Sequence, residues 1–302
     1  MIHLLQNETW RVGVLPETAA SLAFAQIYYQ GAWHDFMRPT PTEAQHDPLG
    51  CASYLLVPWS NRIRDAKFFF AGQEYQLRPS FADGTAIHGA ARHYPWQVTY
   101  ASDTRIRLEF DSRAYDDVNF PFAFRSWVEY QLVGNDFRTL LGVQNIDTQA
   151  MPAGFGTHPM IQRELTGAGD QLAMQLPYAQ AYPLVDCMPT GAPVAVPEAF
   201  DYQQLRQAGN VFVDDCLTGR NMAQQIMLKY DKSKVRIVHW LDFIYTHLVM
   251  YMPVGQSFIA LEPVTNANDG FNLAADGAKE HGVFVLQPGE MREAMSGYIL
   301  TP

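Results

Sequence analysis

The sequence is short of cysteine, with three residues in a chain of 302. Cys51, Cys187 and Cys216 are odd in number and widely spaced, which predicts neither a disulfide framework nor a paired-thiol metal site and fits a reducing compartment. Basic residues are also scarce, because 21 lysines and arginines against 31 acidic residues give a formal net charge of −10. This charge disfavours nucleic acid and anionic membranes as partners.

Long uninterrupted apolar runs are missing as well. Residues 235–254 come nearest, but four polar residues interrupt them: Arg236, His239, Asp242 and His247. The stretch therefore predicts two β-strands with a short connection rather than a membrane helix. The N-terminus has no basic region followed by an apolar segment, so it does not predict a signal peptide. We expect a cytoplasmic protein.

Helical periodicity is scarce, whereas strand patterns recur along the chain. The composition, 48% hydrophobic and 17% charged, is that of a folded globular protein. Alternating apolar residues around turn residues predict hairpins at 67–77, 96–110 and 124–146. Residues 199–207 and 273–281 show only weak helical patterns. No linker or repeat divides the chain, so we predict one all-β domain over residues 1–302, a large antiparallel β-sandwich.

Two polar residues stand directly before prolines at the ends of apolar stretches. His158 occurs in "GFGTHPMI" and Glu262 in "FIALEPVTNAND". A residue before proline is forced into extended backbone, and proline cannot donate to a sheet ladder, so each should stand at a strand end or irregularity. An imidazole and a partly buried carboxyl can exchange protons near neutral pH. A structural role for either residue alone is the commoner case, and a separation of 104 residues does not show that they meet.

Two further stretches add to this pair. "VPWSNRIRDAKFFFAGQEYQL" covers residues 57–77, and "IHGAARHYPW" covers residues 87–96. Together with the His-Pro and Glu-Pro stretches, and in this order, they resemble the aldose 1-epimerase family, the galactose mutarotases. The resemblance covers roughly residues 50–272. It implies a galactose mutarotase-like supersandwich that interconverts the α and β anomers of a free aldose without metal or organic cofactor.

The resemblance also implies roles for individual residues. His158 matches the histidine that protonates the ring oxygen of the sugar, and Glu262 matches the glutamate that removes the proton from the C1 hydroxyl. Arg62, preceded by Asn61, matches the Asn-Arg-Ile element and is expected to hold sugar hydroxyls. His88 matches the histidine of the His-Gly element, a second contact near the ring oxygen. The partner that these roles imply is a small-molecule sugar.

A substrate-binding aspartate is expected between the His-Pro and Glu-Pro motifs. "FVDDCLTG" at 212–219 offers Asp214 and Asp215, and the family pattern favours Asp214. Aromatic faces could cover the sugar ring, and three residues near the motifs are candidates: Trp59, Trp96 and Phe155. We find no cluster at metal-ligand spacing and expect full activity in chelator.

The sequence leaves two alternative functions open. A hexose-6-phosphate 1-epimerase of the same fold would need cations near the motifs, for which Arg64, Arg92 and His93 are the candidates. A non-catalytic sugar-binding protein on the same scaffold would need neither His158 nor Glu262. Departures from the family pattern, such as Met160 after His158-Pro, lie where sugar preference would be set, so the substrate stays open.

Overall fold

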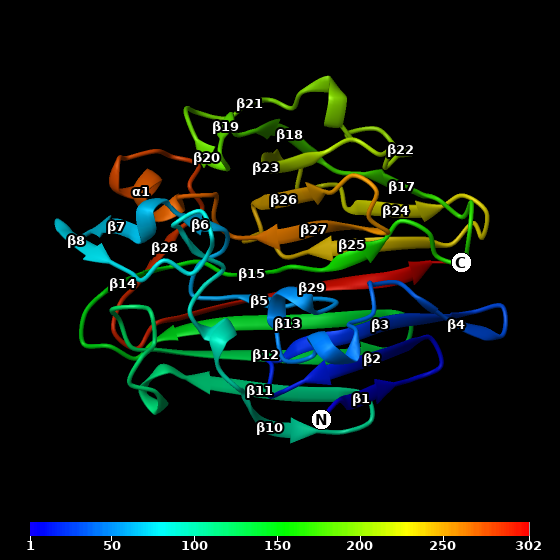
Figure 1. Cartoon of the computed structure of the whole chain (residues 1–302), viewed down its shortest axis with the longest axis horizontal. Helices are drawn as coiled ribbons and strands as arrows, with labels where there is room; N and C mark the ends of the chain where they lie inside the picture. The colour runs from blue at the N-terminus through cyan, green and yellow to red at the C-terminus, as the bar shows by residue number, and fades with distance from the viewer. Residues whose placement is uncertain (302) are drawn as a thin grey trace.

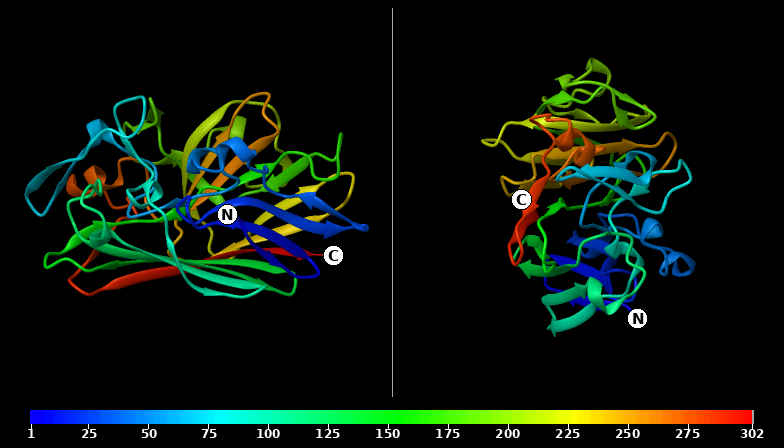
Figure 2. Two further views of the ribbon diagram at one scale, coloured as in Figure 1. Left: turned by 60° about the horizontal axis from the view of Figure 1, so that its bottom comes forward. Right: turned by 90° about the vertical axis from the view of Figure 1, so that its left-hand side faces the viewer.

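The computed structural model describes residues 1–301, which are organised mainly around antiparallel sheets (Figure 1). The largest sheet has nine strands. In spatial order these are β10 (Gln97–Ala101), β11 (Arg105–Asp111), β12 (Phe124–Val133), β13 (Asp136–Asn145), β29 (Met291–Thr301), β25 (Arg236–Leu241), β24 (Ile226–Tyr230), β17 (Leu172–Gln175) and β22 (Arg206–Gln207). Its long central strands form a curved layer at the bottom of the left view in Figure 2.

A second sheet of eight strands lies across this layer. Its path runs through β21 (Val194–Ala195), β18 (Tyr178–Ala181), β23 (Val213–Arg220), β26 (His247–Met252), β27 (Phe258–Val264), β15 (Gly156–Thr157) and β5 (Leu55–Leu56), with β16 (Met160–Gln162) also pairing with β27. A four-stranded sheet comprises β1 (His3–Gln6), β2 (Trp10–Leu15), β3 (Ser21–Tyr29) and β4 (Ala32–Asp35).

Short ribbons complete the fold. They pair β6 (Arg62–Ile63) with β9 (Ala86–Ile87), β7 (Lys67–Phe70) with β8 (Gln73–Gln76), β14 (Met151–Ala153) with β28 (Phe284–Leu286), and β19 (Leu184–Val185) with β20 (Met188–Pro189). Within residues 1–301 the one α-helix is α1 (Gly270–Ala275), and no helix there has the length and apolarity to cross a membrane. The predicted antiparallel all-β fold is therefore confirmed.

Most of the predicted elements are present. The three hairpins form as β7–β8, β10–β11 and β12–β13, and residues 235–254 form β25 and β26 with a short connection. The helical interpretation of residues 199–207 is wrong. That segment holds a 3₁₀ turn at Glu198–Phe200 and the edge strand β22, because Arg206 and Gln207 pair with β17. Pairing at the sheet edge outweighs the weak local helical preference.

The two faces of the eight-stranded sheet have different surroundings. Along β27, Ile259 and Leu261 point into the main hydrophobic core, which extends from Leu5 to Tyr298. The alternate residues Phe258, Ala260 and Val264 lie in a smaller second cluster on the opposite face. Because side chains alternate along a strand, Glu262 lies on the face of this second cluster. We call this face of the sheet the site face.

Candidate functional site

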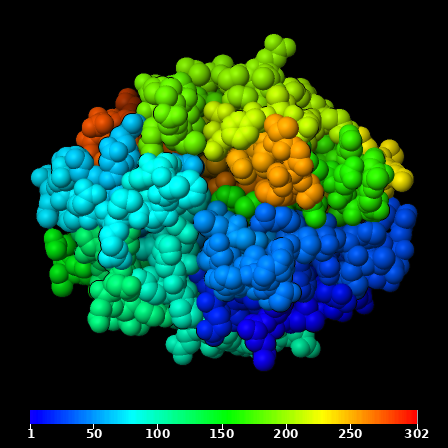
Figure 3. All heavy atoms as spheres, in the orientation of Figure 1, coloured from blue at the N-terminus to red at the C-terminus, as the bar shows by residue number. Residues whose placement is uncertain are grey.

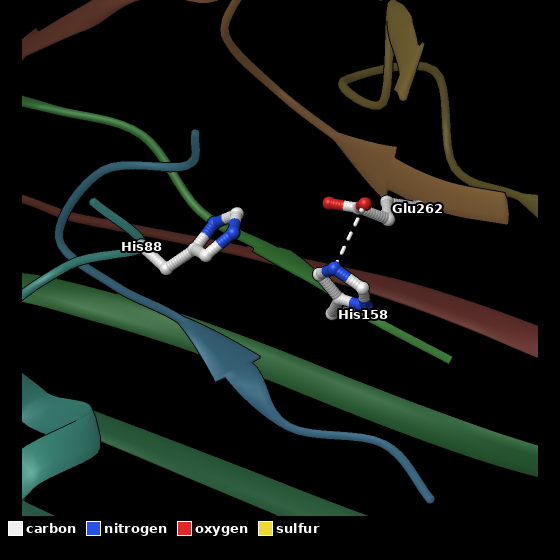
Figure 4. Close-up of side chains that lie close together, drawn as sticks. All are labelled: His88, His158 and Glu262. Atoms are coloured by element: carbon white, nitrogen blue, oxygen red, sulfur yellow. Dashed lines mark ion pairs between the residues drawn. The ribbon is translucent and has the colours of Figure 1, made fainter. Parts of the chain in front are cut away.

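His158 and Glu262 meet across two adjacent antiparallel strands. The register is given by the pairs on either side of them: Gly156 with Val264, and Met160 with Ala260. Both pairs belong to one register without a slip, which puts His158 directly opposite Glu262. Directly opposed residues carry their side chains on the same face, about 5 Å apart at Cβ. The imidazole Nε2 of His158 lies 3.0 Å from Oε1 of Glu262 (Figure 4).

The two prolines explain the local strand geometry. Pro159 falls between β15 and β16, where the ladder with β27 is interrupted, since proline has no N–H to donate. His158 therefore stands at a strand irregularity, as the sequence predicted. Glu262 does not, because it lies inside β27 and pairs with Val249 on β26. The irregularity opposite this carboxylate belongs to the neighbouring strand.

Burial sets the electrostatics of the pair. Only 2% of the Glu262 side chain and 8% of the His158 side chain are exposed to solvent. Burial raises the pKa of the Glu262 carboxyl, and the nearby imidazole of His158 opposes this shift. Tyr54 stacks on the His158 ring with the ring centroids 4.5 Å apart, which holds the imidazole in its orientation. The result is a carboxyl and an imidazole poised to exchange a proton.

His88 lies next to the pair from a different part of the chain. Its ring meets the edge of the His158 ring at a centroid distance of 5.3 Å (Figure 4). Burial lowers the pKa of His88, and the charges of His158 and Arg92 add to the effect. The backbone of His88 has a φ of +58° and its N–H donates to the carbonyl of Asn61, which has a φ of +55°. Both residues are held in left-handed backbone by the tight β6–β9 ribbon.

Gly89 allows this ribbon to approach the sheet. A Cβ added at Gly89 would lie 2.1 Å from the carbonyl oxygen of Val57, and its φ of +78° suits glycine. The segment before Asn61 is fixed by Asn266, just beyond the end of β27. The amide of Asn266 accepts from the N–H and hydroxyl of Ser60 and donates to the carbonyl of Ser60. This buried network holds Asn61 and Arg62 beside the strand that carries Glu262.

The guanidinium of Arg62 is oriented by an acidic neighbour. Its Nε donates to Asp83 at 2.9 Å, and the group lies over the ring of Phe81. Within residues 1–301 this pairing leaves its two terminal nitrogens without a hydrogen-bond partner. Asn61 is buried, and its side-chain oxygen accepts from the N–H of Arg62. Within residues 1–301 the side-chain Nδ2 of Asn61 also has no hydrogen-bond partner, so both residues keep side-chain donors for a ligand.

Sheet register separates the two candidate aspartates. Asp214 and Asp215 lie on β23, where Cys216 is opposite Val249, and Val249 is opposite Glu262. Cys216 and Asp214, two residues apart, therefore share the site face with Glu262. Asp215 is on the other face, opposite Met250 of the main core, and burial raises its pKa to about 6, with the charge of Asp214 adding to the effect. Asp214 is thus the one that shares a face with the pair.

Comparison with known proteins identifies the family of the chain. Residues 26–298 match the family model described as aldose 1-epimerase. The chain belongs to the aldose 1-epimerase family. It is 26% identical to an uncharacterized Escherichia coli (strain K12) protein, YihR, over 86% of this chain and 85% of that protein.

Solved structures share the fold of this aldose 1-epimerase family member. A galactose mutarotase-like protein from Clostridium acetobutylicum superposes with a TM-score of 0.84 at 17% identity, covering 99% of this chain and 94% of that one. An aldose epimerase homologue from C. elegans gives a TM-score of 0.82 at 15% identity, covering 100% and 99%. At these identities the likeness concerns the fold alone.

Some expectations about side chains in this family member are wrong. Three aromatic residues proposed to cover a sugar ring lie instead in the main core: Trp59, Trp96 and Phe155. None of the three lies within a strand, and each packs into the core from a connecting segment. Sequence reasoning also missed Tyr54, which stacks on His158, and Asn266, which holds Ser60. The polar run "TNAND" after Glu262-Pro was the available signal for Asn266.

Sequence spacing gave no sign of a metal site, yet the fold brings three ligand-type side chains together. His88, His158 and Glu262 each offer a ligand atom, and these atoms lie within 4.8 Å of one another. They come from three separate segments, which is why no spacing motif reveals them (Figure 4). The absence of a spacing motif in the sequence is therefore compatible with a cluster of ligand-type side chains in the folded chain.

One face of the molecule is hollowed, and a cavity lies elsewhere on the chain. In Figure 3 cyan, blue, yellow-green and orange segments meet around a recess near the centre of the view, with green atoms at its floor. A separate cavity of about 750 Å³ is lined by residues such as Trp33, Gln171 and Gln256, and none of the expected site residues borders it. This cavity is therefore not part of the candidate site.

Proposed function

We propose that this chain is an aldose 1-epimerase that interconverts the α and β anomers of a free aldose. The observation that carries the proposal is the His158–Glu262 contact of 3.0 Å on a buried face. A hemiacetal carries its hydroxyl oxygen and its ring oxygen on the same carbon. A sugar entering between the two side chains can therefore present the C1 hydroxyl to one and the ring oxygen to the other.

The mechanism is a pair of proton transfers. Glu262 removes the proton from the C1 hydroxyl while His158 delivers a proton to the ring oxygen, and the bond between C1 and that oxygen breaks to give the open-chain aldehyde. Rotation about the C1–C2 bond then turns the other face of the carbonyl toward the ring oxygen. Closure reverses both transfers and leaves the opposite anomer. Burial favours the chemistry, because a carboxyl with a raised pKa is a stronger base.

The remaining side chains are proposed to bind and orient the sugar. Arg62 offers two terminal nitrogens to hydroxyls, and Asp214 offers a carboxylate on the same face as Glu262. His88 is proposed to contact the sugar near the ring oxygen, where it would limit how far the substrate turns. These groups supply the planar hydrogen-bonding partners that a neutral sugar requires.

The contacts of the nearby cations support a neutral aldose over a hexose 6-phosphate. Arg64 pairs with Asp269 and also donates to the carbonyl of Pro189. Arg92 is buried and donates to the carbonyls of Ile87 and Ser80. Burial lowers the pKa of His93 to about 4, and the charge of Arg92 contributes, so this imidazole is neutral at pH 7. A phosphate would have to take these groups from their present partners.

Polarimetry on freshly dissolved pure anomers tests the proposal, with the spontaneous rate subtracted. Glu262→Gln and His158→Asn should each lower kcat by about 10²-fold or more, since each removes one proton-transfer group. Both replacements are close in size to the native residue, so thermal melting should change little. A folded Glu262→Gln protein that mutarotates its best sugar as fast as wild type would mean that the mechanism is wrong. Wild type active only on 6-phosphorylated sugars would favour the phosphosugar alternative.

A further inference from the structure

His88, His158 and Glu262 form a compact donor set with unused capacity. The residues are 6%, 6% and 2% exposed, respectively. Within residues 1–301, Nδ1 of His88, Nδ1 of His158 and Oε2 of Glu262 are buried and have no hydrogen-bond partner. Buried polar groups without partners are costly, and an ion that accepts a lone pair from Nδ1 of His88 and from Oε2 of Glu262 relieves that cost for these two atoms. These three side chains are therefore of the types that bind cations, and cation binding would give unpartnered buried atoms a partner.

The separations suit a metal ion. Zinc bonds to imidazole nitrogen and carboxylate oxygen are about 2.1 Å long, so two ligand atoms on one tetrahedral ion lie about 3.4 Å apart. Nε2 of His158 and Oε1 of Glu262 are already 3.0 Å apart. The ligand atom of His88 lies within 4.8 Å of both. A modest turn of the His88 side chain would therefore bring all three ligand atoms within bonding distance of one ion. Figure 4 shows the His88 ring facing the other two side chains.

We propose that these three side chains bind one divalent transition-metal ion such as Zn²⁺, and that the bound ion excludes the sugar. The exclusion rests on the proposed epimerase function, whereas the binding does not. Two imidazoles with one carboxylate select transition metals over Mg²⁺ and Ca²⁺, which prefer all-oxygen ligands. The ion occupies the place where the two proton-transfer groups must meet the substrate. Zinc is therefore an inhibitor of this site and not its cofactor.

The surroundings predict reversible binding. Metal-bound histidines are usually fixed by a hydrogen bond from the second ring nitrogen, and losing such a partner lowers affinity about 10–100-fold. Nδ1 of His158 has no such partner within residues 1–301, because Tyr54 stacks on the ring face instead. We expect an ion that EDTA removes without unfolding the protein.

Binding is tested on the whole chain after dialysis against EDTA. Titration with ZnCl₂ in a calorimeter should give one ion per chain, and CoCl₂ should give a visible absorption band typical of imidazole-bound cobalt. His88→Asn and Glu262→Gln should each weaken binding at least about tenfold. Asparagine is chosen because it tolerates the positive φ of His88. Thermal melting confirms that each variant is folded.

Two matched variants locate the ion. His46→Asn removes an exposed histidine and should leave the affinity unchanged. Cys187→Ser tests a neighbouring thiol, which lies 3.3 Å from Asp214, and should also leave it unchanged. Loss of binding in Cys187→Ser, or wild-type affinity in a folded His88→Asn protein, would overturn the proposal.

Activity provides the second readout. Metal-free protein should mutarotate at the full rate, ZnCl₂ should inhibit it, and EDTA should restore the rate. Zinc that binds without inhibiting, or that is needed for turnover, would contradict the inhibitory role. The calorimetric result does not depend on turnover, so an inactive protein would refute the proposed function and leave the metal site to be judged by binding alone.

Discussion

The adjacent residues Asp214 and Asp215 differ in the face of the sheet on which they lie. Asp214 shares the site face with Glu262, whereas Asp215 lies opposite Met250 of the main core. Asp214→Asn should raise KM about tenfold or more, because a hydrogen bond to a charged group is worth ~1.5–3 kcal/mol. Asp215→Asn is the matched control and should leave KM unchanged. Polarimetry at varied sugar concentration measures both, and the reverse order of effects would assign the sugar contact to Asp215.

The Asp215 control has a stability signature of its own. Its pKa of about 6 in the folded protein lies above the ordinary value of about 3.9, so at pH 7 the ionised carboxylate destabilises the fold. Replacement by neutral asparagine should leave the melting temperature equal to or above that of wild type. Melting temperatures measured beside KM for both variants separate loss of sugar binding from loss of folding.

At the residue scale, the sequence predicted the identity of the candidate pair but not its contact. Proline after His158 and after Glu262 indicated special backbone, and the resemblance gave each a role. Their proximity depends on strand register, which a one-residue slip would reverse by moving the side chains of one strand to the opposite face. Trp59 is a different case, because it lies in the connection between β5 and β6, and its closeness to a motif in sequence did not show that its side chain packs in the core.

At the scale of elements, Asn266 connects the end of β27 to the segment before β6. Its side chain is buried and makes three hydrogen bonds to Ser60. Asn266→Ala should lower the free energy of unfolding by about 1–3 kcal/mol, because the buried N–H and carbonyl of Ser60 lose their partners. It should also lower kcat/KM, since Asn61 and Arg62 directly follow Ser60.

Urea unfolding followed by circular dichroism measures the stability of Asn266→Ala. Asn210→Ala is a suitable control, because Asn210 is exposed and its side chain accepts one hydrogen bond from Gly255. A surface change of this kind should stay within about 0.5 kcal/mol of wild type. Equal stabilities for the two variants would show that the Asn266 network contributes little to the fold.

Elements formed by local hairpins were predictable, and those formed by distant pairing were not. Residues 124–146 carry both arms and the turn of β12–β13 in one stretch, so alternation and turn residues were enough. The edge strand β22 has only two residues and forms because β17 lies beside it. Likewise β15 and β5 pair across about a hundred residues of sequence, and no local pattern records that pairing.

At the scale of the whole molecule, one hydrophobic core includes residues from Leu5 to Tyr298 and lies between the two large sheets. We therefore propose that the chain unfolds as one cooperative unit, in keeping with the single domain predicted from the sequence. The sequence could predict a sandwich from strand content and turn spacing. It could not predict which strand neighbours which, because the order in each sheet is set by long-range packing.

The single transition should shift to lower temperature as the pH falls, and His239 is one cause. This residue is completely buried on β25 and stacks on Tyr298, and neither ring nitrogen has a hydrogen-bond partner within residues 1–301. Burial lowers its pKa to about 3, and the charge of Arg220 adds to the shift.

The sign of the effect follows from proton binding in the two states. Below about pH 6.5 the unfolded chain protonates His239, whereas the folded chain does so only near pH 3, so stability falls between these values. The slope for one such group approaches about 1.4 kcal/mol per pH unit. His239→Gln removes the titrating group and should reduce the pH dependence of stability between pH 6 and 4 by about this amount. His46→Gln, at an exposed site, should not. Urea unfolding at a series of pH values measures the slopes, and equal slopes for His239→Gln and wild type would exclude His239 as a source of acid sensitivity.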